Sequence, residues 1–281
     1  MLLGQLSFAI NDTIVKYAVK LTKNDYSTLG VIFIRGIFTS FFIFLFIIIL
    51  SKSKIYKVFT NKKSYLRGLF EVLTALFFFA GLILMPMADV YTLLMTTPFM
   101  VTLYAAFFLK EKVGIRRWTA VIVGFVGVII VINPHNLEFG FLFILPIISA
   151  FFLTMRDAVT KEIVNRHNVL EITFVTSVFV MLFSGIGSIL LNVRIEFSNL
   201  IYIFVSSIFL CSGYLCSVLT IFYAPLSLTA SIRYSVIVFG MILGYLYLGE
   251  VPSINMIIGA LIISASGLFV IKRQKELGKI N

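Results

Sequence analysis

The residues of this chain that could do chemistry are mainly charged residues set inside long apolar segments. Asp12 and Lys16 stand four residues apart in one such segment, and Asp157 and Lys161 stand four apart in another. Residues at this spacing meet on one face of a helix, so each aspartate can form an ion pair with its lysine. The alternative is that both lysines only extend to a membrane interface and the aspartates balance their charge.

Four more charged residues lie deeper in apolar segments: Arg35, Glu71, Arg156 and Arg233. Arg233 lies about two turns inside its segment, which is too deep for easy contact with the interface. We predict that Arg233, Arg35 and Arg156 bind substrate or act in gating, with structural ion pairs as the alternative. Glu71 has Arg67 one turn before it, so we expect a local ion pair there, with a titrating carboxylate as the alternative.

Hydroxyl groups and aromatic rings near these charges could line a cavity. Thr96 and Thr97 precede Pro98 in one apolar segment, together with Thr92. Their hydroxyls can satisfy backbone groups freed by the proline or line a polar cavity. Tyr234 is one of several candidates for a stacking wall. The others are Phe77, Phe78, Phe79, Tyr91, Tyr104 and Tyr214.

No residue set in the sequence matches a catalytic or cofactor-binding motif. His135 and His167 fall in predicted loops on opposite sides of the membrane, and there is no metal-ligand spacing, Ser–His–Asp set or phosphate-binding glycine loop. Without a Walker motif, ATP is not expected to drive the protein. Cys211 and Cys216 lie in one apolar segment and are expected to be packing residues without a disulfide. We therefore predict no enzyme activity, no cofactor and no metal.

The segments that carry these residues are long enough to span a membrane. The chain has 281 residues, of which 60% are hydrophobic and 12% are charged. A soluble protein has about a quarter charged residues, and a spanning helix takes about 20 apolar ones. We predict an all-α membrane protein with ten transmembrane helices. Their predicted bounds are Leu2–Val19, Thr28–Leu50, Tyr65–Leu84, Ala88–Leu109, Trp118–Ile132, Phe139–Ala158, Ile172–Leu191, Leu200–Phe222, Leu226–Leu248 and Ile254–Ile271.

The positive charge of the chain is concentrated in alternate loops. The formal net charge is +11. About fifteen lysines and arginines follow the second, fourth, sixth and tenth helices, against three in the other connections. This bias predicts that both termini are cytoplasmic, and it accounts for the net charge without nucleic-acid binding. The first segment lacks a basic region before its apolar run, so no cleavable signal peptide is expected.

One supersecondary unit occurs twice in the sequence. Pro86 precedes Glu111 by 25 residues, and Pro225 precedes Glu250 by the same interval. Such self-similarity indicates a repeat, which we place at residues 1–133 and 138–281 within one membrane domain. Five helices per half is an odd number, so the second half must enter the membrane with opposite polarity. Inverted repeats are characteristic of secondary transporters, which bind substrate near the bilayer midplane.

The inverted repeat gives the two acid–base pairs a common interpretation. It places Asp12 and Lys16 in the outer half of the membrane, and Asp157 and Lys161 toward the cytoplasm. We therefore expect the two pairs to help close alternate gates.

Several motifs resemble the EamA-type drug/metabolite transporter family over essentially the whole chain. They include M-P-M-A-D-V-Y from Met85, T-T-P-F-M-V-T-L from Thr96, L-K-E-K-V-G-I-R-R-W from Leu109 and R-D-A-V-T-K from Arg156. The resemblance implies ten helices in two inverted halves, cytoplasmic termini, and a central cavity formed mainly by helices 1, 3, 4, 6, 8 and 9. The first half is most similar to the branch that includes riboflavin and S-adenosylmethionine carriers. Arg233 has no counterpart in the fourth helix, so its role is not carried over.

Together these features predict a multi-pass secondary transporter of the bacterial inner membrane that works by alternating access. The expected partners are membrane lipid and a small organic substrate with an anionic or zwitterionic group, for which riboflavin, S-adenosylmethionine and an amino acid are candidates. H⁺ or Na⁺ is the expected coupling ion, and the protein is expected to be a monomer or a homodimer. A channel or a membrane-embedded enzyme is the alternative. A channel would show no saturation or counterflow, and an enzyme would need a convergent catalytic cluster.

Overall fold

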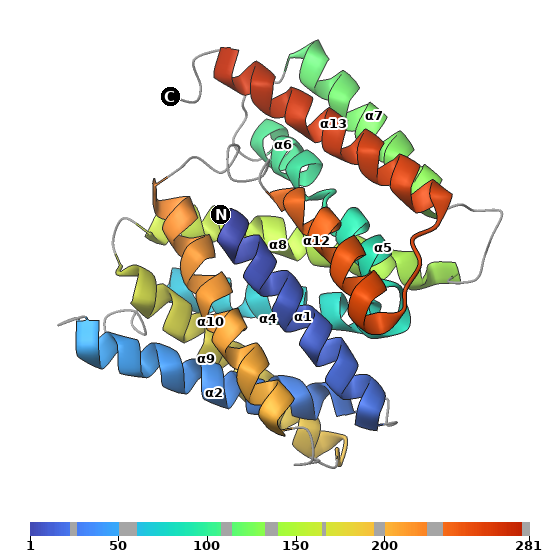
Figure 1. Ribbon diagram of the computed structural model, residues 1–281. Helices are drawn as coiled ribbons and strands as arrows, with labels where there is room; N and C mark the ends of the chain where they lie inside the picture. Colours follow the sequence, from blue (N-terminus) through green and yellow to red (C-terminus); the bar gives the residue numbers. More distant parts are fainter. Residues whose placement is uncertain are drawn as a thin grey trace.

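The described residues of the protein are almost entirely helical. The computed structural model describes residues 1–22, 27–50, 61–107, 114–132, 140–164, 167–193, 200–223 and 233–276, and these contain no strand. The helices are α1 (Leu2–Thr22), α2 (Ser27–Leu50), α4 (Lys62–Leu84), α5 (Met87–Leu94), α6 (Thr97–Phe107), α7 (Ile115–Ile132), η1 (Gly140–Phe143), α8 (Ile144–Ile163), α9 (Val169–Leu190), α10 (Leu200–Tyr223), α12 (Ser235–Leu243), η3 (Gly244–Leu248) and α13 (Ile254–Glu276) (Figure 1). The predicted all-α class is confirmed.

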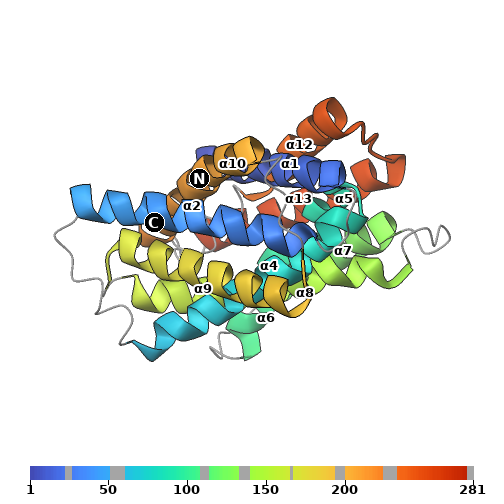
Figure 2. The ribbon, with the colours of Figure 1, turned by 90° about the horizontal axis from the view of Figure 1, so that it is seen from below.

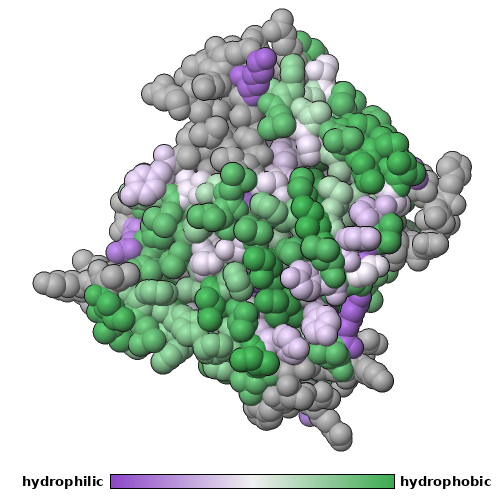
Figure 3. All heavy atoms as spheres, viewed as in Figure 1, coloured by the Kyte–Doolittle hydropathy of each residue, from purple (hydrophilic) through white to green (hydrophobic). Residues whose placement is uncertain are grey.

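The outer surface of the protein matches an apolar solvent. Within the described ranges, five helical stretches are long and apolar enough to cross a membrane, and they lie in α2, α4, η1 with α8, α9 and α10. Shorter apolar stretches lie in α7, in α12 with η3, and in α13. Large apolar side chains such as Ile49, Ile122 and Ile189 point outward, and the face seen in Figure 3 is largely hydrophobic. The protein is therefore a multi-pass membrane protein, while the full set of ten spans stays a prediction.

The helices pack in pairs that join the first half of the chain to the second. α1 packs on α10, α2 on α9, α4 on α8, α5 on α12, and α7 on α13. Figures 1 and 2 show α7 and α13 side by side at one end of the bundle, with α2 and α9 at the other. Exchanging the two predicted halves would leave this set of pairs unchanged. The inverted repeat remains a prediction, and this pairing supports it.

Two breaks, each at or near a proline, separate α4 from α5 and α5 from α6. α4 ends at Leu84 and α5 begins at Met87, so the predicted break around Pro86 is confirmed. The predicted helix Ala88–Leu109 is interrupted near Pro98, as its polar residues suggested, and a turn at Met95 and Thr96 divides it into α5 and α6. Pro98 lacks the backbone N–H that would continue the hydrogen-bond ladder of α5 across this turn.

Other helix ends differ from the prediction where polar residues are buried. α8 continues to Ile163 rather than ending at Ala158, because Asp157 and Thr160 face other helices and not water. α13 continues to Glu276. Three features of the predicted repeat lie outside the described residues: Glu111, Pro225 and the expected helix start at Leu226.

Small residues let α7 and α13 approach closely. A Cβ added at Gly259 of α13 would lie 2.3 Å from Val131 Cγ2 and 2.8 Å from the Gly127 carbonyl oxygen, both on α7. Helices in membranes associate through such close packing, because lipid gives no hydrophobic driving force between them. The Gly127 carbonyl belongs to the backbone, so α7 cannot relieve the clash by a side-chain rotation.

We predict that Gly259→Ala destabilises the protein by about 1–3 kcal/mol, because overpacking forces the two helices apart. The measurement is the melting temperature of purified protein in detergent. Gly114→Ala is the control, since a Cβ there meets no atom of the described residues within 4 Å. Equal melting temperatures for the two variants would contradict the packing argument.

Candidate functional site

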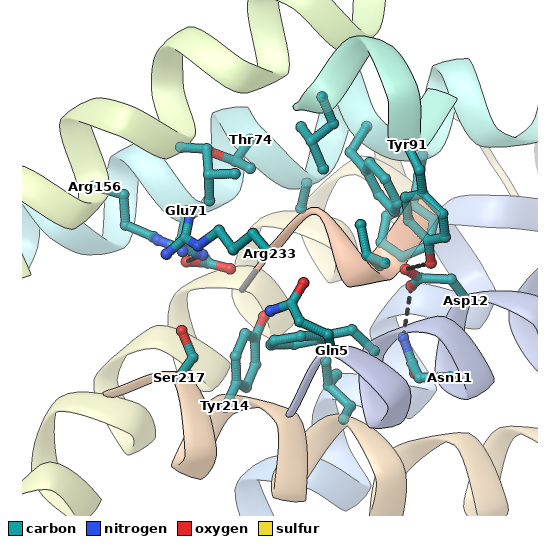
Figure 4. Close-up of a pocket in the computed structure, with 18 of the residues that line it drawn as sticks. Gln5, Asn11, Asp12, Glu71, Thr74, Tyr91, Arg156, Tyr214, Ser217 and Arg233 are labelled. Carbon is teal, nitrogen blue, oxygen red and sulfur yellow. Dashed lines mark hydrogen bonds and ion pairs between the residues drawn. The ribbon is translucent and has the colours of Figure 1, made fainter. Parts of the chain in front are cut away.

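A pocket lies inside the bundle, between α1, α4, α5, α8, α10 and α12 (Figure 4). These correspond to the six helices that the family resemblance implied, and α2 adds Arg35. The pocket contains about 780 Å³ of space free of protein atoms, part of it open to solvent. Its polar lining residues are Gln5, Asn11, Asp12, Arg35, Glu71, Thr74, Tyr91, Arg156, Tyr214, Ser217 and Arg233.

One end of the pocket is formed by a buried network of arginines and carboxylates. Arg156 Nη1 lies 2.9 Å from Glu71 Oε2, and Arg156 Nη2 lies 2.7 Å from Asp157 Oδ1. The other oxygen of Asp157 forms an ion pair with Arg233. The network joins α4, α8 and Arg233, which lies two residues before α12, and Figure 4 shows Arg156, Glu71 and Arg233 converging at this end. Each charge has a partner, as buried ions require.

The expected local pair of Glu71 with Arg67 is wrong. Arg67 Nε instead donates to Thr160 Oγ1 at 2.8 Å, across the contact between α4 and α8. Glu71 is turned into the pocket, where Arg156 of α8 reaches it. A partner on a neighbouring helix has displaced the partner on the same helix.

The opposite end of the pocket is formed by Asp12 and an aromatic group. Asp12 accepts hydrogen bonds from Tyr91 Oη at 2.7 Å and from Asn11 Nδ2 at 2.8 Å. Arg35 Nη1 donates to Asn11 Oδ1 at 3.3 Å, and its guanidinium lies 4.7 Å from the ring centroid of Phe79. Asn11 therefore stands between the acid and the base. Figure 4 shows Asp12, Asn11 and Tyr91 at the end of the pocket away from Arg156.

Close helix packing holds Tyr91 against Asp12. A Cβ added at Gly240 of α12 would lie 2.3 Å from Tyr91 Cδ2, so glycine is needed for the ring to fit. The ring of Tyr91 also stacks on Phe78, with centroids 6.0 Å apart and an interplanar angle of 21°. The Asp12 end is thus a carboxylate backed by two aromatic rings.

The predicted ion pair between Asp12 and Lys16 is wrong. Lys16 Nζ lies 2.6 Å from Glu250 Oε1 and donates to the Met85 carbonyl oxygen, also at 2.6 Å. The second oxygen of Glu250 accepts the backbone N–H of Met87 at 2.7 Å, at the start of α5. We call this set of contacts the Lys16–Glu250 latch. It ties α1, the α4–α5 junction and the end of η3 together, and only the folding of distant segments creates it.

The predicted ion pair between Asp157 and Lys161 is wrong as well. Asp157 is engaged by Arg156 and Arg233, and Lys161 Nζ donates to the Ile221 carbonyl oxygen at 3.0 Å. Lys16 and Lys161 thus each contact a backbone carbonyl near the end of a helix, α4 in one case and α10 in the other.

Three other predicted site residues do not line the pocket. Thr97 Oγ1 donates to the Leu94 carbonyl oxygen at 2.5 Å and closes the turn between α5 and α6. Thr96 Oγ1 and Tyr234 Oη are buried without a hydrogen-bond partner in the part of the chain that the structure describes. Tyr234 precedes α12 directly, so Arg233 lies two residues before that helix, and the helix start expected at Leu226 lies outside the described residues. The guanidinium of Arg233 reaches Asp157.

The sequence analysis missed several polar residues of the pocket. Gln5, Thr74 and Ser217 are neutral and common, and nothing in their spacing distinguishes them. Asn11 could have been found, because a second polar residue beside Asp12 in an apolar helix is itself unusual. In the described residues no cluster of three or more His, Cys, Asp or Glu could hold a metal ion.

We predict that Asp157→Asn lowers stability by about 3–5 kcal/mol, because it leaves two buried guanidiniums short of negative charge. The control is Glu162→Gln, which breaks the exposed ion pair with Lys63 and should change stability by about 0–1 kcal/mol. The melting temperature in detergent measures both. If the two variants melt together, the arginine network does not stabilise the fold.

Comparison with known proteins identifies the family of this chain. The profile of the EamA-like transporter family matches residues 1–133 and again residues 139–272. The chain is similar to the S-adenosylmethionine uptake transporter of Rickettsia bellii, with 26% identity over 277 residues that cover 98% of this chain and 93% of that protein. The riboflavin transporter of Rhizobium johnstonii is 26% identical over 201 residues, covering 69% of this chain and 65% of that protein.

A solved structure has the same fold over nearly the whole chain. The TM-score is 0.68 at 14% sequence identity, and the match covers 98% of this chain and 97% of that one. At this identity the likeness shows the fold alone. The family assignment rests on the family profile, which matches both halves of the sequence. On that evidence the chain belongs to the EamA-like transporter family.

Proposed function

We propose that this protein is a secondary transporter that carries S-adenosylmethionine across the bacterial inner membrane by alternating access. The family and the named relatives support transport of a small metabolite. The observation that carries the proposal is the buried pocket with an arginine network at one end and a carboxylate at the other. Charges are costly in a membrane interior, so a pocket lined by both signs indicates a charged ligand.

The chemistry of S-adenosylmethionine matches this pocket. Its carboxylate suits the guanidiniums of Arg156 and Arg233, which bind planar anions well. Its adenine ring suits the aromatic side chains between the two ends, including Phe8 and Tyr214. The relatives that match this chain over nearly their full length are named as S-adenosylmethionine uptake transporters.

Riboflavin is the second candidate substrate. A riboflavin transporter of Vibrio cholerae is 37% identical to this chain over 71 residues. Riboflavin has aromatic rings and a hydroxylated chain but no cationic or carboxylate group. Binding it would leave Asp12 without a cationic ligand group, so the electrostatics favour S-adenosylmethionine.

Alternating access requires that the pocket be closed from one side at a time, and the Lys16–Glu250 latch suits that role. The latch fastens α1 to the α4–α5 junction and to the end of η3. Of these elements, α1, α4 and α5 line the pocket. The predicted topology places the latch toward the outside. We therefore assign it as the outer gate, in place of the expected pair of Asp12 with Lys16.

We predict saturable counterflow of S-adenosylmethionine in proteoliposomes that contain the purified protein. Counterflow uses unlabelled substrate inside the vesicle as the driving force, so it does not depend on whether H⁺ or Na⁺ is the coupling ion. The panel should also contain riboflavin, methionine and a nucleoside. Uptake that grows linearly with concentration would point to a channel, and counterflow of riboflavin alone would replace the proposed substrate.

We predict that Lys16→Gln and Glu250→Gln open the outer gate, because each removes the ion pair of the latch. The readout is a cysteine at Ala75, which lines the pocket, in a chain whose Cys211 and Cys216 are replaced by serine. A membrane-impermeant maleimide added to right-side-out vesicles should label this cysteine several-fold faster in both variants. Lys20→Gln is the matched control, since Lys20 is an exposed lysine one turn further along α1. Labelling that stays at the control rate in both variants would refute the outer gate.

A further inference from the structure

The Asp12 end of the pocket has an unbalanced charge. Four carboxylates are buried in the described residues: Asp12, Glu71, Asp157 and Glu171. Glu71 and Asp157 pair with arginines, and Glu171 lies 3.6 Å from a nitrogen of His167. Asp12 is the member of this group with no basic side chain at ion-pair distance in the described part of the chain.

The basic side chain of Arg35 is not at ion-pair distance from Asp12. Arg35 contacts Asn11 and the ring of Phe79, and Asn11 separates it from the carboxylate. The hydrogen bonds from Tyr91 and Asn11 are neutral, so they orient the carboxylate without cancelling its charge. A buried ion without a counter-ion is costly in a membrane interior.

The surroundings of Asp12 fit a ligand cation. Tyr91 and Phe78 line the pocket beside it and present stacked aromatic rings. Aromatic faces attract ammonium and other onium groups, and a carboxylate adds a full opposite charge. Asp12 lies at the opposite end of the pocket from the arginine network, so one molecule with separated charges can meet both ends.

We propose that Asp12, with Tyr91 and Phe78, is the subsite for a cationic group and makes the carrier select positively charged substrates over neutral ones. The inference rests on the proposed function and names the charge class of its substrate. For S-adenosylmethionine, the group concerned is the sulfonium, because the ammonium lies beside the carboxylate at the other end of the molecule. The arginine network then receives the carboxylate of the same molecule.

The test compares compounds that differ in charge at one position. S-adenosylhomocysteine lacks the methyl group of S-adenosylmethionine and so lacks the sulfonium charge, while sinefungin carries a protonated amine in its place. Each is measured as a competitor of labelled S-adenosylmethionine in counterflow, and as a stabiliser of purified protein in a thermal-shift titration. We expect S-adenosylmethionine and sinefungin to bind about ten- to hundredfold more tightly than S-adenosylhomocysteine, as for one charged contact.

Asp12→Asn should reduce that preference to about twofold or less, and Asp12→Glu should restore part of it, because the charge returns. Asp89→Asn is the matched control: it removes a carboxylate of the same membrane region that does not line the pocket, and it should keep the preference. If Asp12→Asn does not fold, Asp12→Glu tests the same carboxylate, and equal binding of the three compounds by the wild type would overturn the subsite without any variant.

The two readouts separate this inference from the proposed function. Counterflow of S-adenosylmethionine with equal competition by S-adenosylhomocysteine would keep the carrier and overturn the cation subsite. Charge-selective binding without counterflow would keep the subsite and overturn the carrier. Absence of binding by all three compounds would overturn both. An unchanged preference in Asp12→Asn would place the cation selectivity elsewhere in the pocket.

Discussion

The need to pair charges in a medium without water governs this structure. Arg156 sits between Glu71 and Asp157, and Asp157 in turn meets Arg233, so one network joins α4 and α8 to the residues just before α12. Removing any one member leaves another ion unbalanced, which makes the network cooperative. The same requirement fixes Lys16 on Glu250 and on the Met85 carbonyl. These contacts decide how α1, α4, α5 and α8 meet, and the pocket is the space between them.

Asp12 and Arg35 line the pocket without forming an ion pair in the described residues, and this makes the pocket suited to a charged ligand. Every other buried carboxylate of the described residues has a basic partner, whereas Asp12 has only neutral donors. Among the described residues, Arg35 Nε has no hydrogen-bond partner, and the guanidinium contacts an amide and a ring. A protein that only had to be stable would gain by pairing them directly. Because Asp12 and Arg35 do not pair with each other, both remain able to interact with a charged substrate.

Much of the architecture followed from composition and periodicity, because a bilayer limits the chain to long apolar helices. The all-α class, most helix positions and the break at Pro86 were predicted correctly. Of the candidate residues, Asp12, Arg35, Glu71, Arg156 and Arg233 do line one pocket. The partners were predicted wrongly for Asp12, Glu71 and Asp157, since spacing along one helix reveals only neighbours on that helix. Arg67 and Lys16 stand one turn from acids they do not pair with, because better partners arrive from other helices.

The sequence by itself determined which apolar segments lie in the membrane and which charged residues lie within them. Twenty-residue apolar segments have to be helices in lipid, and an arginine or aspartate within one has to find a partner or a wet cavity. Only the tertiary structure decided whether each charged residue meets a partner in the protein or faces the pocket. Lys16 is 69 residues from Met85 in the chain, and Arg156 is 85 from Glu71. Ion pairs act over a few ångströms, so which charges cancel and which remain for a ligand depends on packing between helices that no local pattern records.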